Sequence, residues 1–257
     1  MNKLNELLAK KDKNLLSVYF TAGYPNLNDT TKIIEALDKN GVDLIEIGLP
    51  FSDPIADGQT IQESSHLALV NGMTTQLMFE QLKALKNTNA VLILMTYLNL
   101  VVHYGFENTL KMCKESNISA MILPDLPLEE YERDYKALCE KYGIKIVMLI
   151  SPESSDERIR AIDNATDSFI YMVSSASVTG TKDDFDEKQC AYFKRISDMN
   201  LKNKRLIGFG ISNKKTKDKA NKYSSGVIIG SAFIKALAQE PNNPEKAVKL
   251  FLEKLEK

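Results

Sequence analysis

The sequence has few of the residues on which disulfide, metal and redox chemistry depend. It contains three cysteines and two histidines in 257 residues. An odd number of widely spaced cysteines does not build a disulfide framework, so we expect Cys113, Cys139 and Cys190 to be reduced packing residues. Neither His66 nor His103 has the spacing of a metal-ligand pair or a nucleophile–base pair, and we expect no metal site. Tryptophan is absent as well, which excludes nothing in a chain of this length.

An excess of charge of one sign and long hydrophobic runs are also missing. Lys and Arg number 33 against 34 Asp and Glu, so the chain has no general attraction for nucleic acid or a membrane surface. The longest apolar runs, such as residues 91–95 and 145–150, have strand length and are too short to cross a bilayer. The N-terminal segment is amphipathic and lacks the apolar region of a secretory signal. We therefore expect a cytoplasmic protein that binds neither nucleic acid nor membrane.

Several motifs of common enzyme classes do not occur. The chain has no G-x-S-x-G, no H-E-x-x-H and no P-loop, which argues against covalent serine, zinc and nucleotide-hydrolysis chemistry. The run Gly208-Phe209-Gly210 lacks the third glycine of a dinucleotide fingerprint and comes late in the chain. Lys145 opens its predicted strand, which is the wrong end for a Schiff-base lysine in a barrel.

What the chain does contain is a regular alternation of strands and helices. We expect strands at residues 17–22, 43–48, 91–96, 120–123, 145–150, 168–173, 205–209 and 226–229. We expect helices at residues 28–40, 75–87, 106–116, 128–142, 154–164, 187–200 and 214–222, and from 231 to 255 with a break at Pro241 and Pro244. Eight β–α alternations in this length predict an α/β fold, a (β/α)8 TIM barrel with an extra N-terminal helix, as a single domain over residues 1–257. A doubly wound open sheet is the alternative.

One carboxylate stands inside an otherwise apolar strand. Leu44 and Glu46 share one face of the strand at residues 43–48, and the isoleucines on either side of Glu46 share the other. Burial raises the pKa of a carboxyl towards the range that suits a general acid at neutral pH. For Glu46 alone, a structural role beside an Arg or a helix N-terminus is the commoner interpretation. However, Glu46 and Asp57 lie at a strand end and on the following loop, where barrels of this type carry catalytic residues.

Glycines follow each of the last three predicted strands. Gly180, Gly210 and Gly230 lie directly after these strands, and Ser231 opens the next helix. Glycine lets a backbone approach a ligand closely, and helix N-termini bind anions. Each glycine alone could serve only to turn the chain. Three in equivalent positions favour a phosphate site, since the loops after strands seven and eight commonly bind phosphate in this fold.

A specific pattern joins these residues to others. Residues 46–58 read E-x-G-x-P-F-S-D-P-x-A-D-G, and the other matching pieces are Phe20-Thr21-Ala22-Gly23-Tyr24-Pro25, Pro124-Asp125-Leu126-Pro127, Tyr171, Val178-Thr179-Gly180, Gly208-Phe209-Gly210-Ile211-Ser212 and Gly230-Ser231-Ala232. With these motifs in this order, the chain resembles the tryptophan synthase alpha subunit family over essentially its whole length.

The resemblance implies a lyase that cleaves indole-3-glycerol phosphate by a retro-aldol route into indole and glyceraldehyde 3-phosphate. It implies that Glu46 moves protons at indole C3 and at the adjacent glycerol hydroxyl. Asp57 would accept the hydrogen bond of indole N1–H as positive charge develops there. The implied substrate contacts are Tyr171, Thr179 and an indole pocket of Phe20, Met95, Ile122 and Phe209, although the last four could equally be ordinary barrel core.

The resemblance also implies a partner. In the family the alpha subunit has no cofactor and works with a beta subunit that holds pyridoxal phosphate, in an alpha2-beta2 tetramer, so Pro54, Tyr97 and Asn99 are expected at the interface. Two residues depart from the common pattern: Ser177 stands where glycine is usual, and Gln59 replaces a common proline. These departures leave open a stand-alone lyase and a catalytically weak allosteric or structural partner. A phosphosugar isomerase on the same fold is a third alternative.

Overall fold

The computed structural model describes residues 2–174 and 184–256, and these form a closed barrel of eight parallel strands. The strands follow the chain around the barrel, and β8 pairs with β1 to close it. They are β1 (Leu15–Thr21), β2 (Leu44–Gly48), β3 (Val91–Met95), β4 (Ile118–Ile122), β5 (Lys145–Ile150), β6 (Ile170–Val173), β7 (Arg205–Gly208) and β8 (Gly226–Ile229). All eight strands lie within three residues of their predicted positions, so the barrel prediction is confirmed and the open sheet is wrong.

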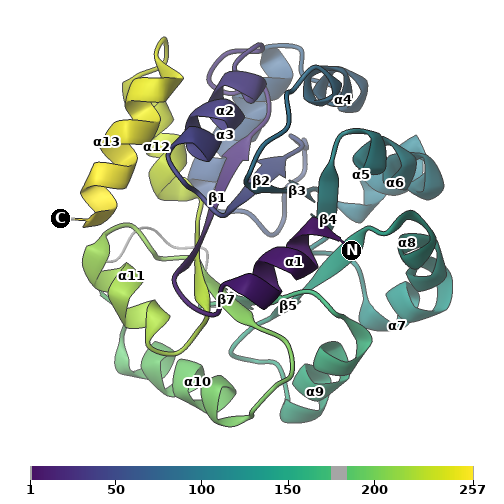
Figure 1. Ribbon diagram of the computed structural model, residues 1–257, viewed down its shortest axis with the longest axis vertical. Coiled ribbons are helices and arrows are strands. Elements are labelled where there is room, and N and C mark those ends of the chain that lie inside the picture. The colour runs from purple at the N-terminus through teal and green to yellow at the C-terminus, as the bar shows by residue number, and fades with distance from the viewer. Residues whose placement is uncertain (1, 175–183, 257) are drawn as a thin grey trace.

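Helices surround this barrel, as Figure 1 shows. They are α1 (Lys3–Lys10), α2 (Thr30–Lys39), α3 (Gln59–Val70), α4 (Thr75–Lys83), α5 (Leu98–Tyr104), α6 (Phe106–Glu115), α7 (Leu128–Glu130), α8 (Lys136–Tyr142), α9 (Asp156–Ala165), α10 (Glu187–Asp198), α11 (Lys214–Asn221), α12 (Ser231–Gln239) and α13 (Pro244–Glu256), with a π-helical turn, η1 (Tyr131–Tyr135), between α7 and α8. No helix in the described part of the chain is both long and apolar enough to cross a membrane.

Three helical features differ from the sequence prediction. Helix α3 was not predicted, because exposed leucines and buried serines blur its amphipathic pattern. Helix α5 was not predicted either, because it is short and meets α6 directly at Gly105. The single helix predicted over 128–142 is divided by the π-helical turn, where Tyr135 stacks on Phe106 with ring centroids 3.9 Å apart.

Two apolar layers hold the fold together. The outer layer lies between the strands and the surrounding helices and includes Ile45 and Ile47. The inner layer fills the barrel and includes Leu44 of the same strand. The alternation predicted for residues 43–48 is therefore confirmed, and it turns Glu46 into the barrel interior.

Helix α1 closes the end of the barrel from which the strands begin. Its Leu4 and Leu8 belong to the inner apolar layer, and Figure 1 views the molecule from this end with α1 across the centre. Asn2 donates hydrogen bonds to the carbonyl oxygens of Ser119 in β4 and of Gly143 before β5, which fixes the helix to the start of both strands. Access to the interior is therefore left to the opposite end, where the strands finish.

Candidate active site

Glu46 is fully buried on the inward face of β2. The hydroxyl of Ser17, on the neighbouring β1, donates a hydrogen bond to Glu46 Oε1 at 2.7 Å. The other oxygen, Oε2, is buried and has no hydrogen-bond partner among the described residues. Burial raises the pKa of Glu46 to about 7, although the Ser17 hydrogen bond opposes this rise. At neutral pH both protonation states are therefore populated, as proton exchange requires.

Asp57 lies on the loop after β2 and is 8% exposed. The hydroxyl of Tyr97, just beyond β3, donates to Asp57 Oδ2 at 3.0 Å and accepts from the backbone N–H of Ala56 at 3.0 Å. Burial raises the pKa of Asp57 to about 6, and the Tyr97 hydrogen bond acts against this rise. The Asp57 side chain is therefore anchored, and it is mostly ionised at neutral pH.

Two buried tyrosines place both carboxylates in one region of the barrel. Burial raises the pKa of Tyr19 and of Tyr171, and the charges of both Glu46 and Asp57 raise them further. The four side chains come from β1, β2, β6 and the loop after β2. All four side chains are buried, and in such surroundings a developing charge interacts strongly with the two carboxylates.

Glycines make room for the two phenol rings. A Cβ atom at Gly48 would lie 2.2 Å from the Tyr19 hydroxyl, and one at Gly208 would lie 2.3 Å from the Tyr171 hydroxyl. Both glycines end their strands, β2 and β7. Any larger residue would displace a tyrosine from the site.

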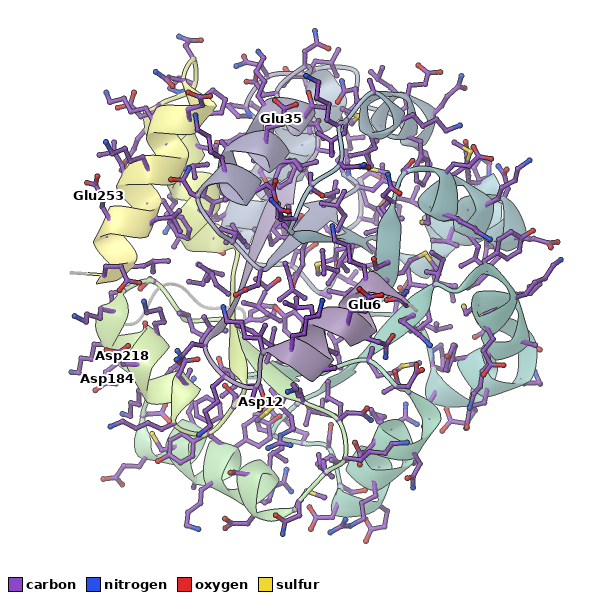
Figure 2. All side chains as sticks on the ribbon, viewed as in Figure 1. Glu6, Asp12, Glu35, Asp184, Asp218 and Glu253 are labelled. Atoms are coloured by element: carbon purple, nitrogen blue, oxygen red, sulfur yellow. The ribbon has the colours of Figure 1, made fainter. Side chains whose placement is uncertain are left out.

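These acidic groups differ in location from most carboxylates of the protein. Figure 2 labels Glu35, Asp218 and Glu253, which extend from α2, α11 and α13 at the periphery. All three are exposed to solvent. The part of the chain that the structure describes contains no group of three or more His, Cys, Asp or Glu residues suited to hold a metal ion.

The predicted indole-pocket residues are only partly brought together. Met95, Ile122 and Phe209 all contact the inner layer, and Phe209 meets Tyr171 edge-on with centroids 6.3 Å apart. Phe20 is a correction, because it pairs with Ile47 on the outward face of the sheet, whereas Tyr19 pairs with Glu46. The alternation of β1 directs Tyr19 inward instead, so the wall predicted for Phe20 belongs to Tyr19.

The predicted phosphate residues lie at the finishing ends of the last strands. Gly210 follows β7 with φ +76°, a conformation that suits glycine. Gly230 precedes α12, and Ser231 is the first residue of this helix, where backbone N–H groups lack intrahelical acceptors. A Cβ at Gly230 would lie 3.3 Å from the ring of Tyr19, so the N-terminus of α12 adjoins the tyrosine. Gly180 and Thr179 lie outside the described residues.

Sequence reasoning missed Ser17 and Tyr19. A signal for both was present, since Ser17, Tyr19 and Thr21 alternate along β1 and must share the inward face. Tyr97, which was predicted for the partner interface, is 5% exposed and bonds Asp57. Of the other interface residues, Pro54 is half-buried and is followed by Ile55, which is 85% exposed, and Asn99 is exposed.

Comparison with known proteins identifies the relatives of this chain. A family described as "Tryptophan synthase alpha chain" matches residues 4–257. The chain belongs to this family. It is 58% identical to the tryptophan synthase alpha chain of Flavobacterium psychrophilum over 240 residues, which is 93% of this chain and 94% of the relative. It is 50% identical to that of Phocaeicola vulgatus, over 99% of both chains.

Solved structures agree with the family assignment. The tryptophan synthase alpha chain of Legionella pneumophila superposes with a TM-score of 0.88 at 28% identity, over 99% of this chain and 96% of that one. A tryptophan synthase alpha subunit from Pyrococcus furiosus superposes with a TM-score of 0.87 at 33% identity, over 95% of this chain and 98% of that one. The chain is therefore the lyase subunit that cleaves indole-3-glycerol phosphate in tryptophan biosynthesis, and the phosphosugar isomerase alternative is wrong.

Proposed function

We propose that Glu46 and Asp57 together carry out the cleavage of indole-3-glycerol phosphate into indole and glyceraldehyde 3-phosphate. The observation that supports this assignment is the pairing of two buried carboxyl groups in one region, with pKa values raised to about 7 and about 6. One is suited to exchange protons at neutral pH, and the other to remain mostly an anion. Their environments thus separate an acid–base role from a charge-stabilising role.

The reaction needs a proton delivered and a proton removed. Glu46 donates its proton to indole C3, which turns the ring into a cationic indolenine and a good leaving group. The resulting carboxylate accepts the proton of the neighbouring glycerol hydroxyl as the C–C bond breaks. The electron pair of that bond returns to the indole ring, and the hydroxyl carbon becomes the aldehyde. Glu46 ends in its starting state.

Asp57 stabilises the charge that appears between these steps. Its carboxylate accepts a hydrogen bond from indole N1–H, which becomes more acidic as the ring gains positive charge. The interaction is therefore stronger in the transition state than in the bound substrate, which raises the rate. The hydrogen bond from Tyr97 holds the carboxylate in place for this purpose.

The substrate phosphate is proposed to bind at the N-terminus of α12. Backbone N–H groups at Ser231 and the helix dipole attract an anion there. Gly210 and Gly230 leave room for its approach, and Gly180 is proposed to complete the phosphate site. Thr179 is proposed to contact the substrate. Tyr171 and Tyr19, with Met95, Ile122 and Phe209, are proposed to enclose the indole ring.

The chain is further proposed to act as a single cytoplasmic domain in an alpha2-beta2 tetramer. The beta partner consumes indole and holds pyridoxal phosphate, whereas the cleavage itself requires only proton transfer and charge stabilisation by this chain. We propose that the partner binds the exposed Ile55 and Asn99 and the half-buried Pro54, which follow β2 and β3 at the open end of the barrel. A tryptophan synthase complex from Pyrococcus furiosus is among the structures that this chain resembles.

Indole release from indole-3-glycerol phosphate tests the assignment. Glu46→Gln and Asp57→Asn are each expected to lower kcat by roughly 10²-fold or more, because each removes one charge-bearing role while keeping the shape. The assay is run with and without a beta subunit, which separates a stand-alone lyase from a chain that needs its partner. Variants that cleave as fast as the unmodified chain would contradict the roles of these two residues.

A further inference from the structure

The two oxygen atoms of the Glu46 carboxyl have different surroundings. Oε1 accepts the hydrogen bond from Ser17 at 2.7 Å, whereas Oε2 is buried without a partner among the described residues. A buried acceptor without a partner destabilises a folded protein, so its presence requires an explanation. The pair is also isolated from the bulk solvent, since neither Ser17 nor Glu46 is exposed.

The Ser17 hydroxyl is committed to Glu46. Its only hydrogen-bond partner in the described part of the chain is Glu46 Oε1. The other hydroxyls on the inward face of β1 are engaged elsewhere: Tyr19 lies 3.3 Å from the Thr21 hydroxyl, and Thr21 lies 2.7 Å from that of Ser64. No neighbour on β1 therefore replaces Ser17 as a donor to this carboxyl.

We propose that Ser17 is a positioning residue, whose hydroxyl holds the Glu46 carboxyl so that Oε2 alone performs both proton transfers of the cleavage reaction. This inference rests on the function proposed above. A serine hydroxyl has one proton, and here it is donated to Oε1, so the proton of the neutral carboxyl resides on Oε2. Oε2 gives this proton to indole C3. The same oxygen then takes the glycerol hydroxyl proton, and the carboxyl is restored without a co-reactant.

The groups around Glu46 predict how the pKa of its carboxyl responds to loss of the Ser17 hydroxyl. The titratable groups that face it are Tyr19 from β1 and Tyr171 from β6, and their pKa values are raised, so both phenols stay neutral at physiological pH. Asp57 acts on the same two phenols. Among these neighbours, only Ser17 donates a hydrogen bond that favours the Glu46 anion. Loss of the hydroxyl should therefore raise the pKa of Glu46 above its present value.

The test compares Ser17→Ala with Ser17→Thr, which keeps a hydroxyl. Ser116→Ala is the matched control, since Ser116 is also buried but its hydroxyl has no partner among the described residues. The Glu46 carboxyl is titrated by NMR in protein with 13C-labelled glutamate, and the signal is assigned from its loss in Glu46→Gln. Indole release is measured over the same pH range, and circular dichroism with indole-3-propanol phosphate binding confirms that each variant is folded.

We expect Ser17→Ala to move the midpoint of the Glu46 titration up by about one pH unit. The same variant should lower kcat about tenfold and leave KM for indole-3-glycerol phosphate little changed. Ser17→Thr should restore most of both properties, and Ser116→Ala should resemble the unmodified chain. An unshifted titration or an unchanged kcat in Ser17→Ala, or a folded Ser17→Thr that behaves like Ser17→Ala, would overturn the inference. If the unmodified chain releases no indole even when a beta subunit is added, the proposed function fails, whereas a shifted titration still shows that Ser17 controls the pKa of Glu46.

Discussion

At the scale of single residues, the reactivity of the site depends on one hydrogen-bond donor for each carboxylate. Ser17 serves Glu46, and Tyr97 serves Asp57. Each donor lowers the pKa of its partner, whereas burial raises it. The balance differs between the two sites, so that Glu46 titrates near neutral pH and Asp57 remains the stronger acid.

Tyr97→Phe tests this balance at Asp57. Removal of the phenol hydroxyl takes away a hydrogen bond to the anion, so the pKa of Asp57 should rise above about 6. Since the ionised form stabilises the transition state, the acid limb of the kcat/KM profile should move to higher pH, and kcat/KM at pH 7 should fall about tenfold. Tyr192→Phe is the control, because the Tyr192 hydroxyl is buried without a partner among the described residues. Superimposable pH profiles of Tyr97→Phe and the control would contradict this role.

At the scale of elements, the site depends on neighbouring strands that end at the same level of the barrel. It also depends on a helix whose N-terminus is proposed to bind the substrate phosphate. The register of β1, β2 and β3 places Tyr19, Glu46 and Ile93 at one level of the barrel. Helix α12 begins directly after β8. The carboxyl ends of parallel strands thus gather side chains from distant parts of the chain at one opening.

Helix α1 has the opposite task, since it seals the other end of the barrel. Leu4→Ala should lower the free energy of unfolding by roughly 2–5 kcal/mol, because Leu4 is fully buried in the inner layer and its loss leaves a cavity. Leu7→Ala is the matched control on the same helix, and its effect should be smaller because Leu7 is only partly buried. Urea unfolding monitored by circular dichroism measures both. Equal losses from the two variants would show that α1 does not close the inner layer as described.

At the scale of the whole molecule, the active site makes stability depend on pH. Glu46 has a pKa of about 7 in the folded protein, above the 4.5 of a free glutamate. The folded state therefore binds more protons than the unfolded state between these values. Stability that is present below pH 4.5 is lost as the pH rises towards 7, by roughly 3 kcal/mol for this group.

Glu46→Gln should remove this dependence. A neutral amide cannot ionise, so the variant should lose less stability than the unmodified chain when the pH rises from 5 to 8. Asp57, with a pKa of about 6, also makes the free energy of unfolding fall as the pH rises, and it does so in both proteins. The difference between their stability–pH curves therefore reports on Glu46. Urea unfolding at a series of pH values provides the measurement. Parallel stability–pH curves for the two proteins would contradict the raised pKa of Glu46.

The amino-acid sequence by itself determined the number, order and spacing of the strands, because period-two alternation and glycine-rich turns are local patterns. It also placed Glu46 and Asp57 at a strand end and on the loop after it, since these positions need only the strand boundary. Helices α3 and α5 were missed for the same local reason, because their own residues carry a weak or short pattern.

Only the tertiary structure decided which side chains meet. Phe20 and Tyr19 are adjacent in the sequence, yet Phe20 lies beside Ile47 on the outward face of the sheet and Tyr19 faces the carboxylates. Ser17 and Glu46 are 29 positions apart, and their hydrogen bond exists because β1 and β2 pair in one register. The shifted pKa values depend on this same closure, since a carboxyl in the open chain is hydrated. The fold class could thus be predicted from local patterns, whereas the reactivity of the site required the closed barrel.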